Sequence, residues 1–143
     1  MSSGEDVGLA DPRLVAALTA ANAAAVRTAL LTARLLVPVL ATGDESTAAE
    51  LAVPGLIGAD GRRALPVFSG VAALQAWRAD ARPVPMPGSQ AVVAAHDEGY
   101  DALVLDIAGP VVHVIDTADL AVLATAARRL LAGDASGIQI LGE

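Results

Sequence analysis

Cysteine and lysine are absent from this chain of 143 residues, and its aromatic residues are limited to Phe68, Trp77 and Tyr100. Without cysteine, the protein cannot form a disulfide framework, a thiol nucleophile or a cysteine-ligated metal site. Because large aromatic side chains are scarce, leucine, valine and alanine must fill the core, and the 33 alanines favour close packing of helices. The length suits one domain with a substantial core.

Positive charge is also scarce. The nine basic residues are all arginine, and the formal net charge is −7 at pH 7. The densest basic spots are the pairs Arg62-Arg63 and Arg128-Arg129, with Arg78 and Arg82 near each other in sequence. Proteins bind nucleic acids with clustered lysine and arginine that neutralise phosphates, and these spots are too few for that task. We therefore predict that nucleic acid is not a partner.

Long apolar runs and an N-terminal targeting segment are missing as well. Residues 1–6 are small or acidic, whereas a signal peptide needs basic residues followed by an apolar run. The longest uncharged stretches, such as 14–26 and 64–77, are shorter than the roughly 18 residues of a membrane span. We expect a cytoplasmic protein that does not contact membranes.

The N-terminal part predicts a loose tail over residues 1–10, followed by helical structure. Asp11 is a helix cap and Pro12 suits the first helical position, where its missing N–H costs nothing. Apolar residues then recur at helical spacing, starting with Leu14 and Leu18. Asn22 could cap a second helix, so the sequence leaves open whether this segment forms one helix or two.

Strands are predicted in the middle of the chain. The apolar run 35–40 indicates a strand, and Pro38 places it at an edge or at a bulge because proline has no ladder donor. Residues 51–59 and 62–68 flank Asp60-Gly61, which predicts a two-residue hairpin over 51–68. That turn pairs Ala59 with Arg62, Ile57 with Ala64 and Leu56 with Leu65, with a change of pairing at Pro66. Thr42 to Ala49 is expected to be a loop.

Two helices with serine caps are expected next. Ser69 would cap a short helix whose residues Val71, Leu74 and Trp77 share one face. The proline-rich segment 82–88 must be extended, because each proline restricts the residue before it. Ser89 would cap a helix that runs to about Glu98 and is ended by Gly99.

The C-terminal part predicts two strands, 102–107 and 110–115, joined by a turn at Ala108-Gly109. Thr117 would cap a last helix that is closed by Gly133 and has Arg128 and Arg129 at its carbonyl end. Its expected inward residues are Leu120, Leu123, Ala127, Leu130 and Leu131. Residues 138–141 are a further candidate for an edge strand. Together these elements predict a single α+β (mixed α/β) domain over 11–143, with a mixed sheet and three to five helices packed on it.

Two segments carry a family resemblance. Leu35-Leu36-Val37-Pro38-Val39 follows a helix, and Leu65-Pro66-Val67-Phe68-Ser69 is followed eight residues later by Trp77. Both resemble the N-terminal domain of the SseB family, although Ser69 stands where threonine is usual in that family. The resemblance implies the fold, but it brings no settled activity, because the shared motifs are structural.

Candidate catalytic residues are scattered along the sequence. His96, Asp97 and Glu98 are consecutive at a helix end, so their side chains point in different directions. His113 and Asp116 lie on opposite faces of a strand, and we expect His113 to be partly buried and hydrogen-bonded.

Other polar positions have structural interpretations. Asp106 follows a strand, where α/β enzymes place ligands, but an aspartate before a Gly-Pro turn more often serves the turn itself. The glycines near Gly61 match neither the G-x-G-x-x-G pattern nor the Walker pattern of nucleotide-binding loops. No serine lies in the G-x-S-x-G motif of hydrolases. We predict no catalytic, cofactor-binding or metal-binding residues, and hence no cofactor.

Partner recognition is the remaining functional feature. Four residues in or near a rigid proline-rich strip belong to types that are enriched at protein interfaces: Trp77, Arg78, Arg82 and Met86. Alternatively, Trp77 belongs to the hydrophobic core, because a protein with few aromatic residues usually buries them. We therefore expect a non-enzymatic interaction or regulatory module that binds a protein partner.

Two other functions stay open. An accessory or immunity-type protein could mask a partner through its acidic surface. An enzyme of unrecognised class could use Asp106, His113 or Arg63.

Overall fold

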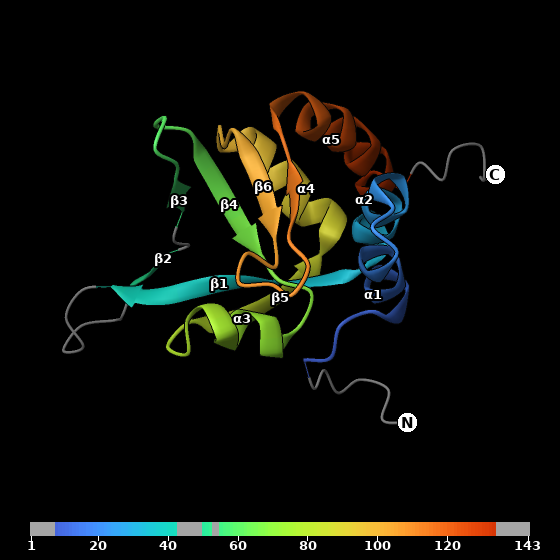
Figure 1. Ribbon diagram of the computed structural model, residues 1–143. Helices are drawn as coiled ribbons and strands as arrows, with labels where there is room; N and C mark the ends of the chain where they lie inside the picture. Colours follow the sequence, from blue (N-terminus) through green and yellow to red (C-terminus); the bar gives the residue numbers. More distant parts are fainter. Residues whose placement is uncertain (1–7, 43–49, 53–54, 134–143) are drawn as a thin grey trace.

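The computed structural model describes residues 8–42, 50–52 and 55–133, and these form one α+β domain (Figure 1). Most of the expected N-terminal tail, most of the loop expected at 42–49 and the strand expected at 138–141 lie outside the described residues, while Thr42 itself is the last residue of a strand. The elements are, in chain order, α1 (Pro12–Thr19), α2 (Ala23–Thr32), β1 (Arg34–Thr42), β2 (Glu50–Ala52), β3 (Leu56–Ile57), β4 (Arg63–Val67), α3 (Val71–Trp77), β5 (Arg82–Pro87), α4 (Gly88–Asp97), β6 (Ala102–Leu105), β7 (His113–Ile115) and α5 (Thr117–Leu131).

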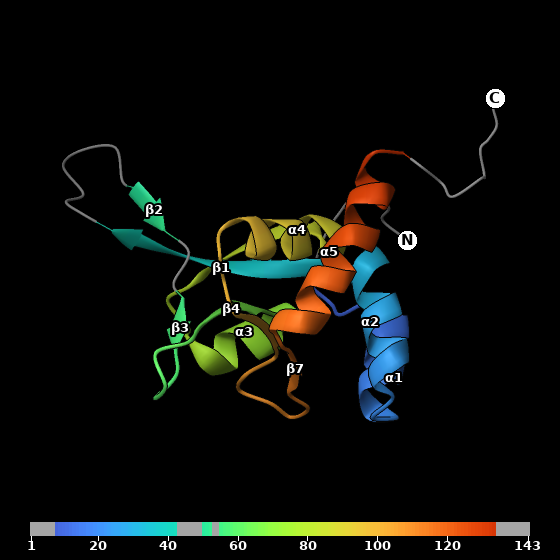
Figure 2. The ribbon, with the colours of Figure 1, turned by 90° about the horizontal axis from the view of Figure 1, so that it is seen from above.

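The strands form two sheets that meet at β1. One is antiparallel with the order β2-β1-β5, and the other is mixed with the order β3-β4-β6-β7, in which β4 and β6 are parallel. A reciprocal pair of backbone hydrogen bonds joins the sheets, from Leu36 N to Phe68 O (2.8 Å) and from Phe68 N to Leu36 O (2.9 Å). Figure 2 shows α3 and α4 on opposite sides of β1.

The N-terminal segment contains two helices, which settles the alternative that the sequence left open. Asp11 Oδ1 accepts a hydrogen bond from Arg13 N (2.8 Å) at the start of α1, and Asn22 Oδ1 accepts one from Ala25 N (3.1 Å) at the start of α2. Gly8, which precedes α1, is bound to the start of α3, because its carbonyl accepts a hydrogen bond from Val71 N (2.8 Å).

β1 is buried on both faces, which explains its continuous apolar sequence. Leu35 and Val37 belong to the main core, whereas Leu36 belongs to a second cluster with Phe68 and Leu74. Both expected positions of Pro38 are wrong: β1 lies between β2 and β5 rather than at an edge, and its pairing with β5 runs through Pro38 without a bulge.

Pro38 is tolerated in this central strand because of where its nitrogen faces. The backbone groups of Leu36 face Phe68, away from β5, and Pro38 two residues later faces the same side. On that side of β1, Pro38 lies between Leu36, which bonds to Phe68, and Leu40, where the pairing with β2 starts. Proline therefore removes no hydrogen bond from either pairing.

The same alternation explains the prolines of β5. Leu36 pairs with Pro85 across β1 and β5, and its backbone groups point the other way, so the nitrogen of Pro85 faces the free edge. Pro83 and Pro87 lie two residues to either side and share this orientation. The outer edge of β5 therefore presents no N–H donor, and it cannot accept a full additional strand.

The hairpin formed by β3 and β4 differs from the prediction in two ways: its loop is one residue longer, and the pairing of its strands is shifted by one residue. Leu56 pairs with Ala64 and Ile57 with Arg63, because the loop contains three residues rather than two. Gly61 has a φ of +84° and its N–H bonds to Gly58 O (2.9 Å), which is the pattern of a turn followed by a left-handed residue. Pairing with β3 ends before Pro66, as predicted, while β2 pairs with β1 instead of extending the hairpin.

Three predicted helix caps are wrong by one or two positions. The cap residues are Gly70 for α3, Pro87 for α4 and Asp116 for α5, where Asp116 Oδ1 accepts a hydrogen bond from Asp119 N (3.2 Å). Ser69 and Thr117 donate their hydroxyl hydrogen bonds to distant partners instead, to Asp106 Oδ2 (2.7 Å) and to Asp101 O (2.6 Å).

The last part of the chain also departs from the sequence expectations. β6 ends at Leu105 because Asp106 adopts a positive φ of 56°, and β7 starts only at His113. On α5, Leu120, Leu123 and Ala127 are buried as predicted. Leu130 and Leu131 were expected to face inward, but they are 45% and 49% exposed, because the last turn of α5 extends past the core. Among the helices that the structure describes, none is both long and apolar enough to cross a membrane.

Gly88, the first residue of α4, marks a close contact between two helices. Its N–H bonds to Ala33 O (2.8 Å), and an added β-carbon would overlap the carbonyl oxygen of Leu30 in α2. Backbone atoms have little room to move there, so only glycine fits.

We predict that Gly88→Ala lowers the free energy of unfolding by about 3 kcal/mol or more, at the upper end of overpacking costs, because α2 and α4 must separate. Gly99→Ala is the matched control: Gly99 has a φ of +82° but open space around it, so strain alone should cost about 1–2 kcal/mol. Urea unfolding of both variants measures the difference. Equal costs for the two variants would show that the helix contact is not tight.

Candidate functional site

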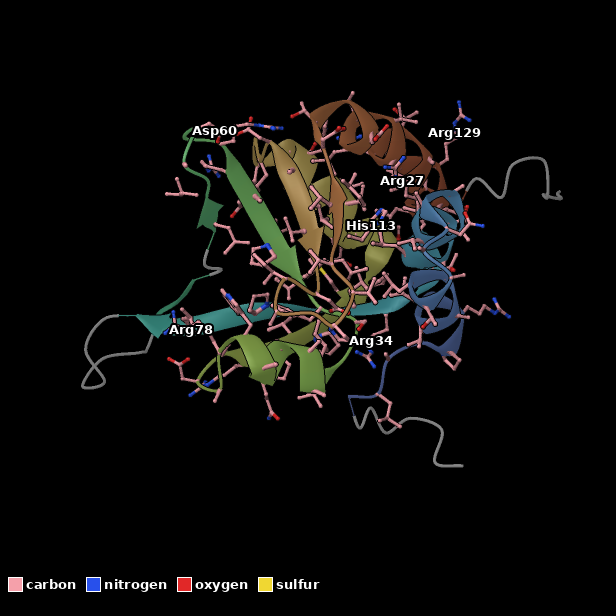
Figure 3. The ribbon with its side chains drawn as sticks, viewed as in Figure 1. Arg27, Arg34, Asp60, Arg78, His113 and Arg129 are labelled. Carbon is pink, nitrogen blue, oxygen red and sulfur yellow. The ribbon has the colours of Figure 1, made fainter. Side chains whose placement is uncertain are left out.

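Polar and titratable groups are spread over the fold: in Figure 3, Asp60, Arg78 and Arg129 lie in separate parts of the molecule, whereas Arg27 and His113 lie close together. Three groups matter for chemistry: the Ser69–Asp106 pair, the surroundings of His113, and the end of α4. Among the described residues, no three histidine, aspartate or glutamate side chains gather in a way that could hold a metal ion.

Ser69 and Asp106 form a buried pair at the carboxyl ends of the parallel strands β4 and β6. Asp106 Oδ1 accepts a hydrogen bond from Ser69 N (2.8 Å), and Oδ2 accepts one from Ser69 Oγ (2.7 Å). The two residues are 6% and 4% exposed. Burial raises the pKa of Asp106, although the two hydrogen bonds from Ser69 oppose the rise.

This pair corrects two predictions from the sequence. Ser69 does not cap α3, and the side chain of Asp106 does not serve its own turn; only the backbone carbonyl of Asp106 does, by accepting a hydrogen bond from Gly109 N (2.8 Å). Both carboxylate oxygens are engaged by Ser69, so the pair fastens the start of α3 to the end of β6. A hollow of about 510 Å³ beside it is lined mainly by alanine and glycine.

His113 is the first residue of β7 and is partly buried, as predicted. Its expected hydrogen bond is absent at Nε2: this buried atom has no partner among the described residues. Burial lowers the pKa of His113, and the positive charge of Arg27 adds to the effect. Arg27 itself forms an ion pair with Asp119 (3.0 Å), while Asp116 caps α5, so His113 and Asp116 do not meet.

The prediction that the three consecutive residues at the end of α4 diverge is wrong for two of them, because His96 and Asp97 both contact Arg128 of α5. Asp97 is bound by Arg128 of α5, and the hydrogen bond from this guanidinium lowers the pKa of Asp97. His96 Nδ1 lies 3.7 Å from Asp97 Oδ1. Glu98, the cap residue at the end of α4, points away from both of them.

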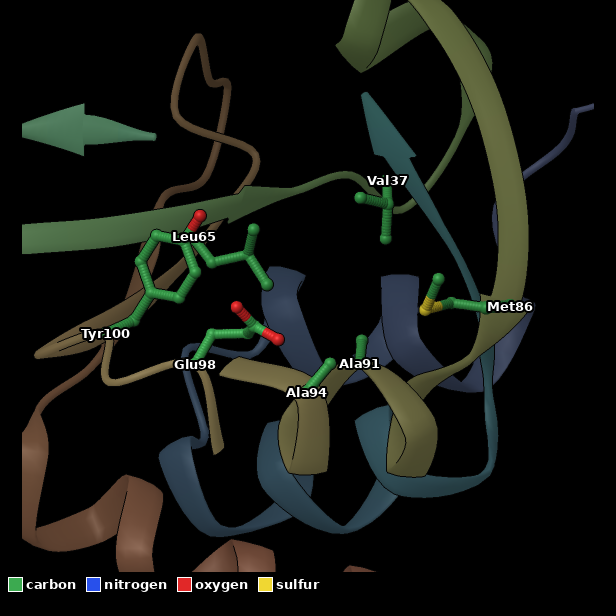
Figure 4. A pocket seen from close by; sticks show the side chains of 7 residues that line it. All are labelled: Val37, Leu65, Met86, Ala91, Ala94, Glu98 and Tyr100. Atoms are coloured by element: carbon green, nitrogen blue, oxygen red, sulfur yellow. The ribbon is translucent and has the colours of Figure 1, made fainter. Parts of the chain in front are cut away.

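Glu98 borders an apolar pocket of about 370 Å³ that lies between α4 and the strands β1, β4 and β5 (Figure 4). Alternation along the strands directs their inward side chains to it, and two alanines three residues apart on α4 leave the space open. The lining residues are Val37, Leu65, Met86, Ala91, Ala94, Glu98 and Tyr100. The volume falls within the range of ligand pockets in proteins.

The pocket has a polar end and an apolar end. Figure 4 shows the Glu98 carboxylate directed into the pocket between Ala94 and the Tyr100 ring, whereas Val37 and Met86 lie at the other end. The Glu98 carboxylate forms no hydrogen bond or ion pair within the described part of the chain. The guanidinium carbon of Arg63 lies 4.6 Å from the centre of the Tyr100 ring, a cation–π contact.

The four residues predicted to bind a partner do not form one surface. Met86 lines the pocket and packs against the main core, whereas Trp77 packs in the second cluster with its ring centre 5.4 Å from that of Phe68. Arg78 pairs with Asp80 (2.9 Å). Trp77 and Met86 therefore lie on opposite faces of β1, because Leu36 and Leu35 point to opposite sides.

Arg82 belongs to the pocket side of β5. It pairs with Val39, so its side chain shares the face of Val84 and Met86, and it is exposed. Glu98 and Tyr100 were not predicted as neighbours in one pocket. The sequence shows only that Glu98 is a carboxylate just before Gly99, the glycine that ends a helix. That pattern is common at solvated helix ends and does not indicate a pocket.

We predict that Asp106→Asn changes the pH dependence of stability. The amide has nearly the same shape and still accepts a hydrogen bond from Ser69 N, but it cannot ionise. Because the pKa of Asp106 is raised, its contribution to stability is complete below the ordinary aspartate pKa of about 3.9 and is lost as the pH rises through the raised value. The stability of the variant relative to the natural protein should therefore increase over this window.

Urea unfolding at a series of pH values from about 3.5 to 8 measures this difference. Other carboxylates titrate in both proteins, so their effects cancel. A difference that stays constant across the series would contradict the raised pKa of Asp106, because a pKa that differs between the folded and unfolded protein must make stability depend on pH.

Comparison with known proteins identifies the family. The SseB protein N-terminal domain matches residues 13–122, which is well over half of the chain. No curated protein and no solved structure matches the chain. The matched region includes α1 to α4, both sheets and the pocket. The chain therefore belongs to the SseB family through its N-terminal domain.

Proposed function

We propose that this domain is a non-enzymatic interaction module that binds a protein partner by taking an apolar side chain of that partner into the pocket between α4 and β5. The observation that carries the proposal is the pocket itself: it is apolar over most of its surface and partly open to solvent. Burial of an apolar side chain there would contribute roughly 1.5–3 kcal/mol to binding.

The surroundings of the pocket support a protein segment as the occupant. Val84 lies next to Met86 on the same face of β5, and it is 36% exposed. The apolar surface therefore continues along the strand beyond the pocket, which suits an extended segment better than a compact ligand.

The prolines of β5 limit how such a partner can bind. Many peptides bind by adding a strand to a sheet edge, but the outer edge of β5 offers no N–H donor. A partner on this side must then be held by side chains in the pocket rather than by a ladder of backbone hydrogen bonds.

The distribution of polar groups supports a non-enzymatic role. Enzyme sites usually combine a nucleophile or base with a second polar group in one pocket. The candidate groups lie in three different places outside the pocket: Ser69 with Asp106, His113, and Asp97 with Arg128. The pocket is lined by Glu98 and Tyr100 but by no serine, histidine or arginine.

Selection of random peptides displayed on phage tests the proposal. The selection uses the full chain and two variants, Ala94→Phe and Ala121→Phe. Ala94 is an exposed residue of α4 that lines the pocket, and phenylalanine there would fill it. Ala121 is an exposed residue of α5 outside the pocket and controls for a new aromatic ring on a helix.

We expect peptides with an apolar anchor residue to be enriched on the natural protein. Their affinity should fall at least tenfold on Ala94→Phe and stay within twofold on Ala121→Phe, because a blocked pocket removes the burial of the anchor. Failure to enrich any peptide, or equal binding to Ala94→Phe, would contradict the proposal.

A further inference from the structure

We infer that the segment bound in the pocket carries a cation, an arginine or lysine, next to its apolar anchor, and that Glu98 is the residue that selects it. This inference rests on the proposed function and specifies the chemistry of the partner. The juxtaposition behind it is one carboxylate directed into an otherwise apolar pocket (Figure 4).

Glu98 is placed to attract a cation for two reasons. Its carboxylate has no partner among the described residues, so a bound cation would not have to displace one. It also occupies the cap position at the end of α4, where the last carbonyl groups of the helix add partial negative charge.

The cations nearest in the fold are engaged elsewhere. Arg128 binds Asp97, and Arg63 lies on the Tyr100 ring. Arg62 donates a hydrogen bond to Thr117 Oγ1 (3.1 Å). None of these three arginines forms a hydrogen bond or ion pair with Glu98 in the described part of the chain, so the charge of Glu98 remains available to a partner.

The net charge of the protein acts in the same direction. A chain with a formal net charge of −7 attracts basic segments over longer distances and repels acidic ones. The pocket would then orient the segment, with the anchor at the end formed by Val37 and Met86 and the cation at the end formed by Glu98 and Tyr100.

The test compares peptides selected on the natural protein with those selected on Glu98→Gln. Asp60→Asn is the matched control, because it also removes one negative charge, but from the exposed loop between β3 and β4. We expect arginine or lysine beside the anchor in peptides from the natural protein and from Asp60→Asn, and no such preference on Glu98→Gln.

Matched peptides then measure the size of the effect. In one selected peptide, the basic residue is arginine or its neutral analogue citrulline. We expect the arginine form to bind roughly threefold to fivefold more tightly, as for one partly exposed charge pair, and this ratio should fall to one on Glu98→Gln and shrink in salt.

The failures of the two proposals are distinguishable. Apolar peptides that depend on the pocket but show no basic preference would contradict the role of Glu98 and leave the interaction module standing. Peptides that bind Ala94→Phe as well as the natural protein would contradict both. Binding of hexylamine in the pocket without enrichment of any peptide would assign the site to a small amine and would contradict the protein partner.

Discussion

The fold depends on the point where β1 crosses the end of β4. There, Leu36 and Phe68 exchange two backbone hydrogen bonds, and these join a sheet of three strands to a sheet of four. Because β1 passes between α3 and α4, its alternating side chains must supply two separate apolar clusters. The main core and the pocket lie on the α4 side, and the cluster around Trp77 lies on the α3 side.

Local signals in the sequence predicted much of the fold. Asp11 and Asn22 cap helices because a side-chain oxygen can reach an N–H two or three residues ahead, and the sequence alone shows such a relation. The register of the hairpin was missed because Gly61 adopts a left-handed conformation after a turn, which adds one residue to the loop. Ser69 and Asp106 were misassigned because their partners are each other, 37 positions apart in the chain. The pocket was missed for the same reason: it exists only where α4 meets strands that are distant in sequence.

The separation of Trp77 from Met86 changes how this domain can recognise a partner. The sequence places both residues near a proline-rich strip, which suggested one continuous surface. In the fold, the strip is β5, and its prolines remove hydrogen-bond donors from the sheet edge while Met86 faces the pocket. The two faces of β1 then differ: side chains pack around Phe68 on one side, and the pocket proposed to bind a partner lies beside α4 on the other. This division depends on β1 being held at Leu36.

NMR spectroscopy can test most directly whether the pocket side is the binding side. The chain contains two methionines and one tryptophan, so a protein labelled at the methionine methyl groups and at the indole nitrogen gives one probe on each face of β1. Met86→Leu assigns the pocket signal. The account predicts that a peptide with an apolar anchor next to arginine shifts the Met86 methyl resonance and leaves the Trp77 indole resonance unchanged. A shift of the Trp77 signal with an unchanged Met86 signal would contradict it.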